Sequence, residues 1–164
     1  VLECPLQCND QEYTMDFEDL EKKLSDPLTT LMILCNPHNP VGKVWTGEEL
    51  QKIGSLCKKH HVVVLSDEIH CDLTLNQAEY VPFAAASAEC AQNSITCIAA
   101  SKAFNLAGFQ SAAVYIPNEG IRAVMDRGRI FSRKPFRVKA YKIRCNLSFV
   151  GRCICFDKGR TGTM

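Results

Sequence analysis

The sequence predicts an α/β fold, a three-layer α/β/α sandwich with a mostly parallel sheet. Residues 31–35 and 62–65 are continuous apolar runs, the pattern of strands that are covered on both faces. An amphipathic helical pattern lies between these runs and begins after Thr46. A strand, a helix and a second strand in this order form a βαβ unit, whose crossover is right-handed and whose strands are parallel.

Two helices are predicted by their N-terminal signals. Asp16 precedes an i, i+3, i+7 apolar pattern over 17–24, with acidic residues early and lysines late, so we expect Asp16 to cap a short amphipathic helix. Thr46 and Glu49 have the spacing of a capping box, and the apolar face that follows continues to Cys57. The second pattern predicts the crossover helix of the βαβ unit.

Two further strands are expected later in the chain. Residues 95–100 form a third apolar run, and residues 111–116 form a fourth. Asn118 is a suitable N-cap for a helix that runs to about Arg127. Residues 73–93 show no clear period, and neither do those after 127, so no element is assigned to either stretch.

The composition is that of an ordinary globular protein with an unusual number of cysteines. The chain has 164 residues, 46% hydrophobic and 23% charged, and no apolar run approaches the ~20 residues of a membrane span. Its ten cysteines lack paired CxxC spacing. We interpret five of them as buried free thiols in a reducing, cytoplasmic compartment, with zinc ligation as a minor alternative. These five are Cys35, Cys57, Cys71, Cys90 and Cys97.

The charge is divided unevenly along the chain. Residues 1–126 contain 17 acidic and 8 basic residues, whereas residues 127–164 contain 1 acidic and 11 basic residues. Such an asymmetry marks either a tail that binds acidic partners or a stretch of different origin. We therefore expect 1–128 to be the central part of one domain and 129–164 to be a divergent basic tail, aberrant in origin or poorly ordered.

Three polar residues follow the carboxyl ends of the apolar runs: Asn39, Asp67 and Lys102. Each has an ordinary explanation by itself, because Asn and Asp often cap turns and helices and lysines are common at surfaces. If the strands are parallel, however, the three side chains meet at the edge of the sheet where open α/β folds bind ligands. Together they predict one site.

The three functional groups suit one cofactor, pyridoxal 5′-phosphate (PLP). An amine forms a Schiff base with its aldehyde, a carboxylate keeps its pyridine nitrogen protonated, and an amide donates to its ring oxygen. Burial at a strand end is expected to make the Lys102 amine a better nucleophile. We therefore predict a PLP site containing Asn39, Asp67 and Lys102.

The motifs at these positions resemble a known family. Asn36–Gly42 (NPHNPVG), Ser66–His70 (SDEIH) and Ser101–Gly108 (SKAFNLAG) resemble fold-type I PLP-dependent enzymes, in particular the cystathionine β-lyase (C–S lyase) branch of the class I/II aminotransferase superfamily. The resemblance extends over about 1–128.

The resemblance implies roles for five residues and an incomplete PLP-dependent transferase large domain. Lys102 would be the Schiff-base lysine and catalytic proton carrier, and Asp67 would pair with the pyridine nitrogen. Asn39 and His70 would lie along the ring oxygen edge, and Ser101 would contact the phosphate.

The resemblance also implies a reaction, PLP-dependent C–S β-lysis. L-Cystathionine or a related cysteine S-conjugate would yield a thiol, pyruvate and ammonia. The substrate would be a small sulfur-containing amino acid and the full-length enzyme a cytoplasmic homodimer, and we expect no membrane or nucleic-acid partner. Two alternatives remain: a class I/II aminotransferase, and a catalytically inactive fragment or interaction module with a basic tail.

Two positions depart from the family pattern. Gln110 stands where many aminotransferases have a phosphate-binding arginine, and Ala99 where many have a phosphate-binding serine. The glycine-rich phosphate turn and the substrate-binding arginine of the family are not visible in this sequence. We therefore expect this chain to bind PLP weakly.

Overall fold

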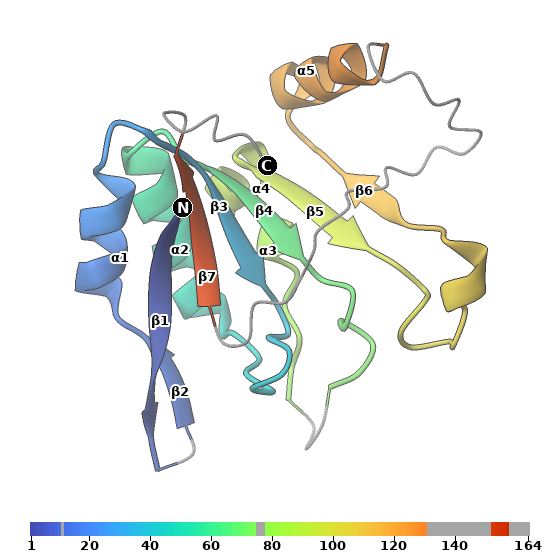
Figure 1. Ribbon diagram of the computed structural model, residues 1–164, viewed down its shortest axis with the longest axis horizontal. Helices are drawn as coiled ribbons and strands as arrows, with labels where there is room; N and C mark the ends of the chain where they lie inside the picture. The colour runs from blue at the N-terminus through green and yellow to red at the C-terminus, as the bar shows by residue number, and fades with distance from the viewer. Residues whose placement is uncertain (11, 75–77, 131–151, 158–164) are drawn as a thin grey trace.

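In the computed structural model, the described residues form an α/β domain built on one sheet of seven strands, in the order β2-β1-β7-β3-β4-β5-β6 (Figure 1). The residues described are 1–10, 12–74, 78–130 and 152–157. The strands are β1 (Leu2–Asn9), β2 (Glu12–Met15), β3 (Thr29–Cys35), β4 (Val63–Asp67), β5 (Ser94–Ile98), β6 (Ala113–Tyr115) and β7 (Arg152–Asp157).

The centre of the sheet is parallel and its flanks are antiparallel. β3 pairs with β4 in parallel, and β4 pairs with β5 in parallel. Among the described strands, the pairs β1–β2, β1–β7, β3–β7 and β5–β6 are antiparallel. The predicted α/β class and the parallel βαβ unit are confirmed, and the sheet as a whole is mixed because β2, β6 and β7 run against the central strands.

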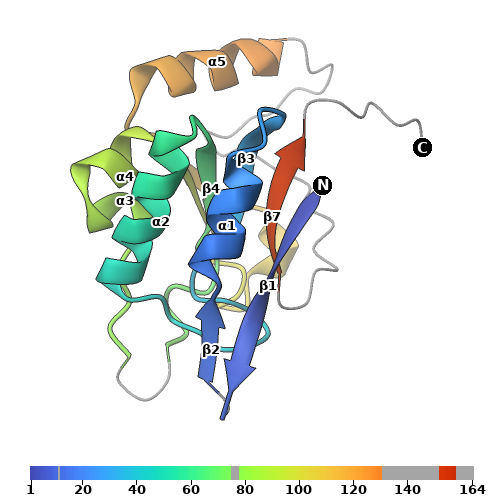
Figure 2. The same ribbon diagram turned by 90° about the vertical axis from the view of Figure 1, so that its left-hand side faces the viewer.

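The helices of the described part are α1 (Phe17–Leu24), α2 (Gly47–Lys59), α3 (Phe83–Ala86), α4 (Ala88–Gln92) and α5 (Glu119–Ile130), with a 3₁₀ turn η1 (Ala107–Phe109). Figures 1 and 2 show α1 to α4 on one face of the sheet and α5 beyond its upper end. No described helix covers the opposite face, so the second helical layer of the predicted sandwich is not seen in this part of the chain. None of the helices in the described ranges is long and apolar enough to cross a membrane.

The predicted helix caps form as the sequence indicates. The Asp16 side chain accepts hydrogen bonds from the backbone N–H groups of Glu18 and Asp19, both at 3.0 Å. Thr46 and Glu49 form both bonds of the capping box at the start of α2. The Asn118 side chain accepts from the N–H groups at the start of α5. These caps fix where the helices begin and thereby set the connections to the sheet.

The core lies between the parallel strands and α1 and α2. Met32 and Leu34 alternate along β3 toward the helices, and both are fully buried. They belong to a cluster that also contains Leu20, Leu24, Trp45, Leu50, Ile53, Cys57, Val62, Val64 and Phe83. Burial of this many apolar side chains anchors β3 and β4, the two strands that lead to Asn39 and Asp67.

The predicted tail is only partly described. Residues 131–151 and 158–164 of the predicted tail 129–164 lie outside the described residues, so the boundary at 128 stays a prediction. The described strand β7 lies between β1 and β3 and is antiparallel to both.

In the described part, free thiols are found at Cys8, Cys35, Cys71 and Cys90. Cys57 and Cys90 are buried as predicted, and Cys35, Cys71 and Cys97 are partly buried. Within the described ranges, no group of three or more His, Cys, Asp or Glu side chains is placed to hold a metal ion.

Candidate active site at the carboxyl edge of the parallel strands

The three parallel strands end at the same edge of the sheet, as the motifs require. The arrowheads of β3, β4 and β5 point the same way in Figure 1. Cys35, Asp67 and Cys97 are paired across these strands in register. The loops that carry the other predicted site residues therefore all leave from this edge.

The loop after β3 is held by its own backbone and by the core. The His38 N–H donates to the Lys43 carbonyl at 2.7 Å, and the Gly42 N–H donates to the His38 carbonyl at 2.8 Å. Gly42 has φ = 74°, a left-handed conformation that favours glycine. The buried Trp45 indole donates to the Cys35 carbonyl at 2.9 Å. These contacts fix a tight loop that leaves Asn39 exposed at its tip.

Asp67 ends β4 and is buried, with 8% of its surface exposed. One carboxylate oxygen accepts a long hydrogen bond of 3.3 Å from the Ile69 N–H. Burial raises the pKa of the Asp67 carboxyl, whereas the Ile69 N–H and the charges of His70 and Lys102 lower it. Asp67 is thus a buried acid that the chain partners only weakly, in a position that favours a neighbouring cation.

His70 is in electrostatic contact with both Asp67 and Lys102. Burial lowers the pKa of the His70 imidazole, Asp67 raises it, and Lys102 lowers it. The His70 Nδ1 atom is buried without a hydrogen-bond partner among the described residues. The structure therefore brings Asp67, His70 and Lys102 into one electrostatic environment, although they are far apart in the sequence.

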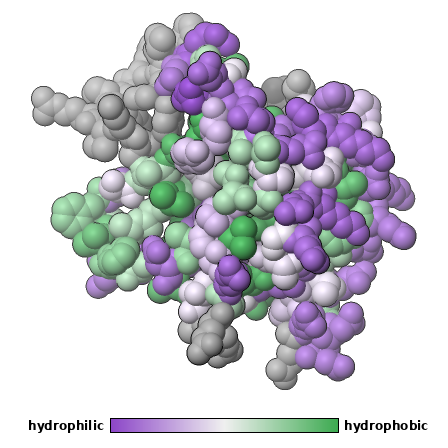
Figure 3. Space-filling model, turned by 180° about the vertical axis from the view of Figure 1, so that it is seen from behind, coloured by the Kyte–Doolittle hydropathy of each residue, from purple (hydrophilic) through white to green (hydrophobic). Residues whose placement is uncertain are grey.

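Lys102 itself is exposed, which differs from the expectation of a buried strand-end lysine. β5 ends at Ile98, so three residues separate the strand from Lys102. Ser101 and Lys102 lie in a turn that the Phe104 N–H closes on the Ala100 carbonyl at 3.1 Å. The described residues do not cover this turn, and its neighbours Phe104 and Phe109 are 63% and 77% exposed. Figure 3 shows apolar side chains at the edge of the molecule where η1 lies.

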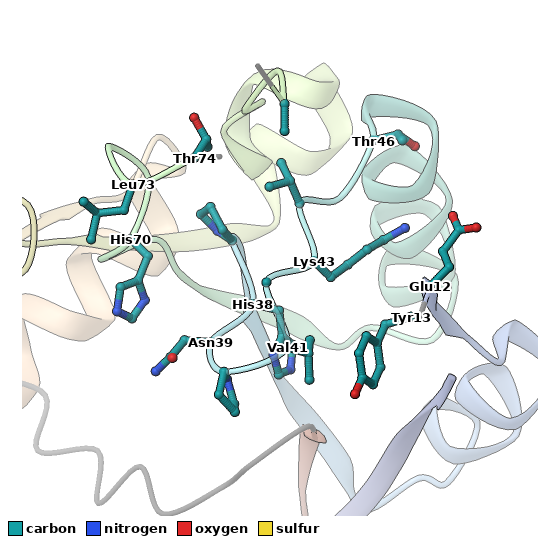
Figure 4. Close-up of a pocket in the computed structure, with 15 residues that line it drawn as sticks. Glu12, Tyr13, His38, Asn39, Val41, Lys43, Thr46, His70, Leu73 and Thr74 are labelled. Atoms are coloured by element: carbon teal, nitrogen blue, oxygen red, sulfur yellow. The ribbon is translucent and has the colours of Figure 1, made fainter. Parts of the chain in front are cut away.

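A cavity of about 610 Å³ adjoins two of the predicted residues. Asn39 and His70 line it, and Figure 4 shows their side chains on the same side of the cavity. Asp67, Ser101 and Lys102 do not line it. Both Asn39 and Asp67 act on the Cys35 thiol, which lies between them in the chain of interactions. Burial raises the pKa of this thiol to about 11. The backbone N–H of Asn39 lowers the pKa, and the charge of Asp67 raises it.

Sequence reasoning missed two residues beside the site, Asn36 and Glu68, which are both buried. Asn36 donates its backbone N–H to the Asp67 carbonyl at 2.9 Å and its side-chain amide to the Val81 carbonyl at 2.9 Å. Glu68 accepts three hydrogen bonds. Both residues could have been identified from the sequence, because each is a polar residue that directly follows a buried strand.

An α/β sheet that gathers an acid, an imidazole and an amine beyond the ends of its parallel strands defines a ligand-binding domain of the open α/β type. Comparison with known families makes this assignment specific. The chain belongs to the aminotransferase class I and II family, whose profile matches residues 3–135.

Individual relatives agree with the predicted branch. The chain is 54% identical over 123 residues to the cystathionine β-lyase PatB of Bacillus subtilis. The matched region covers 75% of this chain and 32% of PatB. Cystalysin of Treponema denticola, solved with PLP, is 40% identical with a TM-score of 0.75 over 81% of this chain and 34% of cystalysin. A PLP-bound putative aminotransferase of Clostridium difficile is 48% identical with a TM-score of 0.72, over 77% of this chain and 33% of that protein. The chain thus spans about a third of the length of these relatives.

Proposed function

We propose that this chain is the central part of the cofactor domain of a PLP-dependent C–S β-lyase. The enzyme would cleave L-cystathionine or a related cysteine S-conjugate to a thiol, pyruvate and ammonia. The similarity to PatB and cystalysin supports this reaction. The observation that carries the proposal is the buried Asp67 carboxylate, whose charge acts on both His70 and Lys102 at the carboxyl edge of parallel strands.

The described residues fit PLP in three respects. Asp67 is a buried acid with one weak partner, so a protonated pyridine nitrogen would supply the missing cation. The unpartnered Nδ1 of His70 is available to a polar group at the ring edge. The amine of Lys102 is exposed and open to an aldehyde.

When bound, PLP supplies an electron sink for the charge that develops at the substrate α-carbon. Asp67 would hold the proton on the ring nitrogen, and Asn39 would donate its side-chain amide to the ring oxygen with His70 near the same edge. Ser101 would contact the phosphate. Lys102 would take the α-proton, and the C–S bond would break so that the sulfur leaves with the bonding electron pair. Proton transfer by a positioned side chain of this kind contributes a factor of roughly 10²–10⁴ to the rate.

Two other functions each have an observation in their favour. The similarity to the putative aminotransferase of Clostridium difficile favours transamination by the same residues. The excess of basic over acidic residues in 127–164, 11 against 1, favours an interaction module with a basic tail. Products distinguish the first alternative, because elimination releases thiol and ammonia whereas transamination retains the sulfur in a keto acid.

We also propose a cytoplasmic homodimer for the full-length enzyme. The free thiols of Cys8, Cys35, Cys71 and Cys90 suit a reducing compartment. The exposed apolar side chains Ile98, Phe104 and Phe109 suit contact with further polypeptide near Lys102.

The proposal is tested by adding PLP to the purified chain and recording the visible absorbance of lysine-bound PLP. We expect a weak but saturable band in the wild type that Lys102→Ala abolishes and Lys43→Ala retains, because Lys43 is paired with Glu49 at 3.0 Å. Thiol and pyruvate are then assayed with L-cystathionine. A wild type that forms no band, or a band that survives Lys102→Ala, contradicts the proposal.

A further inference from the structure

Glu68, directly after Asp67, is a buried carboxylate. It is not among the residues to which the family resemblance gives a role. Glu68 is 1% exposed and lies between Asp67 and the loop that carries His70. Its backbone N–H donates to the Cys97 carbonyl of β5 at 2.8 Å. Glu68 therefore continues the pairing of β4 with β5 past the end of β4, while its side chain enters the core.

Every described hydrogen bond of this side chain reaches either β4 or the far end of the following loop. Oε1 accepts from the Ser66 hydroxyl at 2.7 Å and from the Phe83 N–H at 2.9 Å. Oε2 accepts from the Tyr80 hydroxyl. Burial and the charge of Asp67 raise the pKa of the Glu68 carboxyl, and the three donors lower it, the Tyr80 hydroxyl most among them.

These contacts join the two ends of one loop. The loop leaves β4 at Glu68 and Ile69 and carries His70 near its start. It ends at Tyr80 and at Phe83, the first residue of α3. Asn36 adds a second tie, because its side-chain amide donates to the Val81 carbonyl. The His70 backbone takes part in only one further described bond, in which its carbonyl accepts from the Leu73 N–H at 2.9 Å. The position of His70 thus depends on how the loop ends are held.

We propose that Glu68 is a positioning residue, which clasps Tyr80 and Phe83 and thereby keeps His70 against Asp67 and Lys102. Charge-assisted hydrogen bonds in a buried site are the stronger ones, and here they replace helix or strand pairing that the loop lacks. The role of this clasp in catalysis rests on the proposed function, whereas the position of His70 is measurable without PLP.

The test measures the full chain without PLP by NMR, using the His70 imidazole titration and backbone amide exchange. Tyr80→Phe removes one donor and keeps the Ser66 and Phe83 bonds, so the fold is retained. We expect the His70 pKa to rise toward that of an exposed imidazole, since burial is the largest cause of its lowering. Exchange over 69–74 and 78–81 should quicken about tenfold, the effect of losing one hydrogen bond to a charged group.

Three further variants make the comparison specific. Glu68→Ala should raise the His70 pKa and the loop exchange rate more than Tyr80→Phe does. Glu68→Gln should change both quantities less than Glu68→Ala, because the Gln amide can still form a hydrogen bond with Tyr80. Tyr115→Phe, at an exposed tyrosine of β6, is the matched control and should change neither readout.

Two results overturn the inference. The first is an unchanged His70 titration in Tyr80→Phe and Glu68→Ala. The second is exchange that quickens equally in Met32, Leu34 and the loop, which means that Glu68 only stabilises the whole domain. Loss of lysine-bound PLP absorbance in Tyr80→Phe would show that the Glu68–Tyr80 bond also supports cofactor binding. Absence of that absorbance band in the wild type would count against the proposed function alone.

Discussion

The ends of β4 and β5 lie side by side, yet they are built in opposite ways. Beyond β4, Asp67 and Glu68 are buried and bonded to strands, a helix start and a loop. Beyond β5, Lys102 is exposed, and so are the aromatic side chains of Phe104 and Phe109. The same parallel topology positions both ends, but only the acid's side is fixed by contacts within the described chain.

This difference matches what each half of the proposed PLP site would require. The acid would need a rigid, buried setting so that its charge is directed at one partner, and its local contacts supply such a setting. The amine would need access for a carbonyl compound, and its apolar surroundings remain open in the described part. Stability and cofactor binding should therefore respond to mutations in different halves.

The largest expected effect is a difference in unfolding free energy between mutations in the packed core and mutations in the exposed segment around Lys102. Leu34→Ala empties a fully buried position on β3 and should lower the free energy of unfolding by about 2–5 kcal/mol. Leu106→Ala, at a leucine that is 41% exposed beside Lys102, should change it by less than about 1 kcal/mol. Urea denaturation of both variants measures this. Equal losses would show that the Lys102 segment is as well packed as the core.

A smaller effect is expected from the helix caps. Thr46→Ala removes one bond of the capping box of α2, a helix of the core, and should cost about 1 kcal/mol of unfolding free energy. Asn118→Ala removes the cap of α5, which lies apart from α1 to α4 in Figures 1 and 2. Its effect should be confined to faster amide exchange at the start of α5 and at the end of α4, where the Gln92 carbonyl accepts from the Asn118 side chain at 2.9 Å. A global loss for Asn118→Ala equal to that of Thr46→Ala would contradict the distinction.

The smallest expected effect is a pH dependence from Asp67. Its folded-state pKa is raised above the ordinary 3.8, so the folded state binds this proton more tightly than the unfolded state. The resulting stabilisation is complete below pH 3.8 and is lost as the pH rises through the folded-state pKa. Asp67→Asn lacks this titration, so its stability relative to the wild type should increase as the pH rises from below 3.8 to 7.

Denaturation of Asp67→Asn and the wild type over this pH range checks the sign. Asp10→Asn, at an exposed position in the β1–β2 turn, is the control and should follow the wild type. A relative stability of Asp67→Asn that decreases with pH would mean that the carboxylate is better partnered in the fold than its one long hydrogen bond indicates.

The sequence predicted the elements whose signals are local. Asp16, Thr46 and Glu49 mark helix starts by their spacing, and the apolar runs mark the parallel strands. The β1–β2 hairpin was missed, although Leu2, Cys4 and Leu6 alternate before a turn in which Asp10 has φ = 46°. Helices α3 and α4 have four and five residues, which is too short for a period to be visible.

The sequence predicted which strand ends come together, but it did not predict the environment of the residues beyond them. Parallel strands imply that residues after their ends converge, and Asp67, His70 and Lys102 do interact electrostatically. The exposure of Lys102 was not predictable, because burial at that position depends on contacts from elsewhere in the fold. The Glu68–Tyr80 bond was equally hidden, since it joins two residues across a loop without any periodic pattern.

The central claim is that Lys102 and Asp67 belong to one PLP site. The most direct measurement is to treat the chain with PLP and sodium borohydride, which fixes PLP on the lysine it has joined, and to map the modified lysines by mass spectrometry. We expect Lys102 to be labelled first, and we expect Asp67→Ala to reduce labelling at Lys102 but not at the exposed Lys22 and Lys58. Labelling spread evenly over the exposed lysines and unaffected by Asp67→Ala would contradict it.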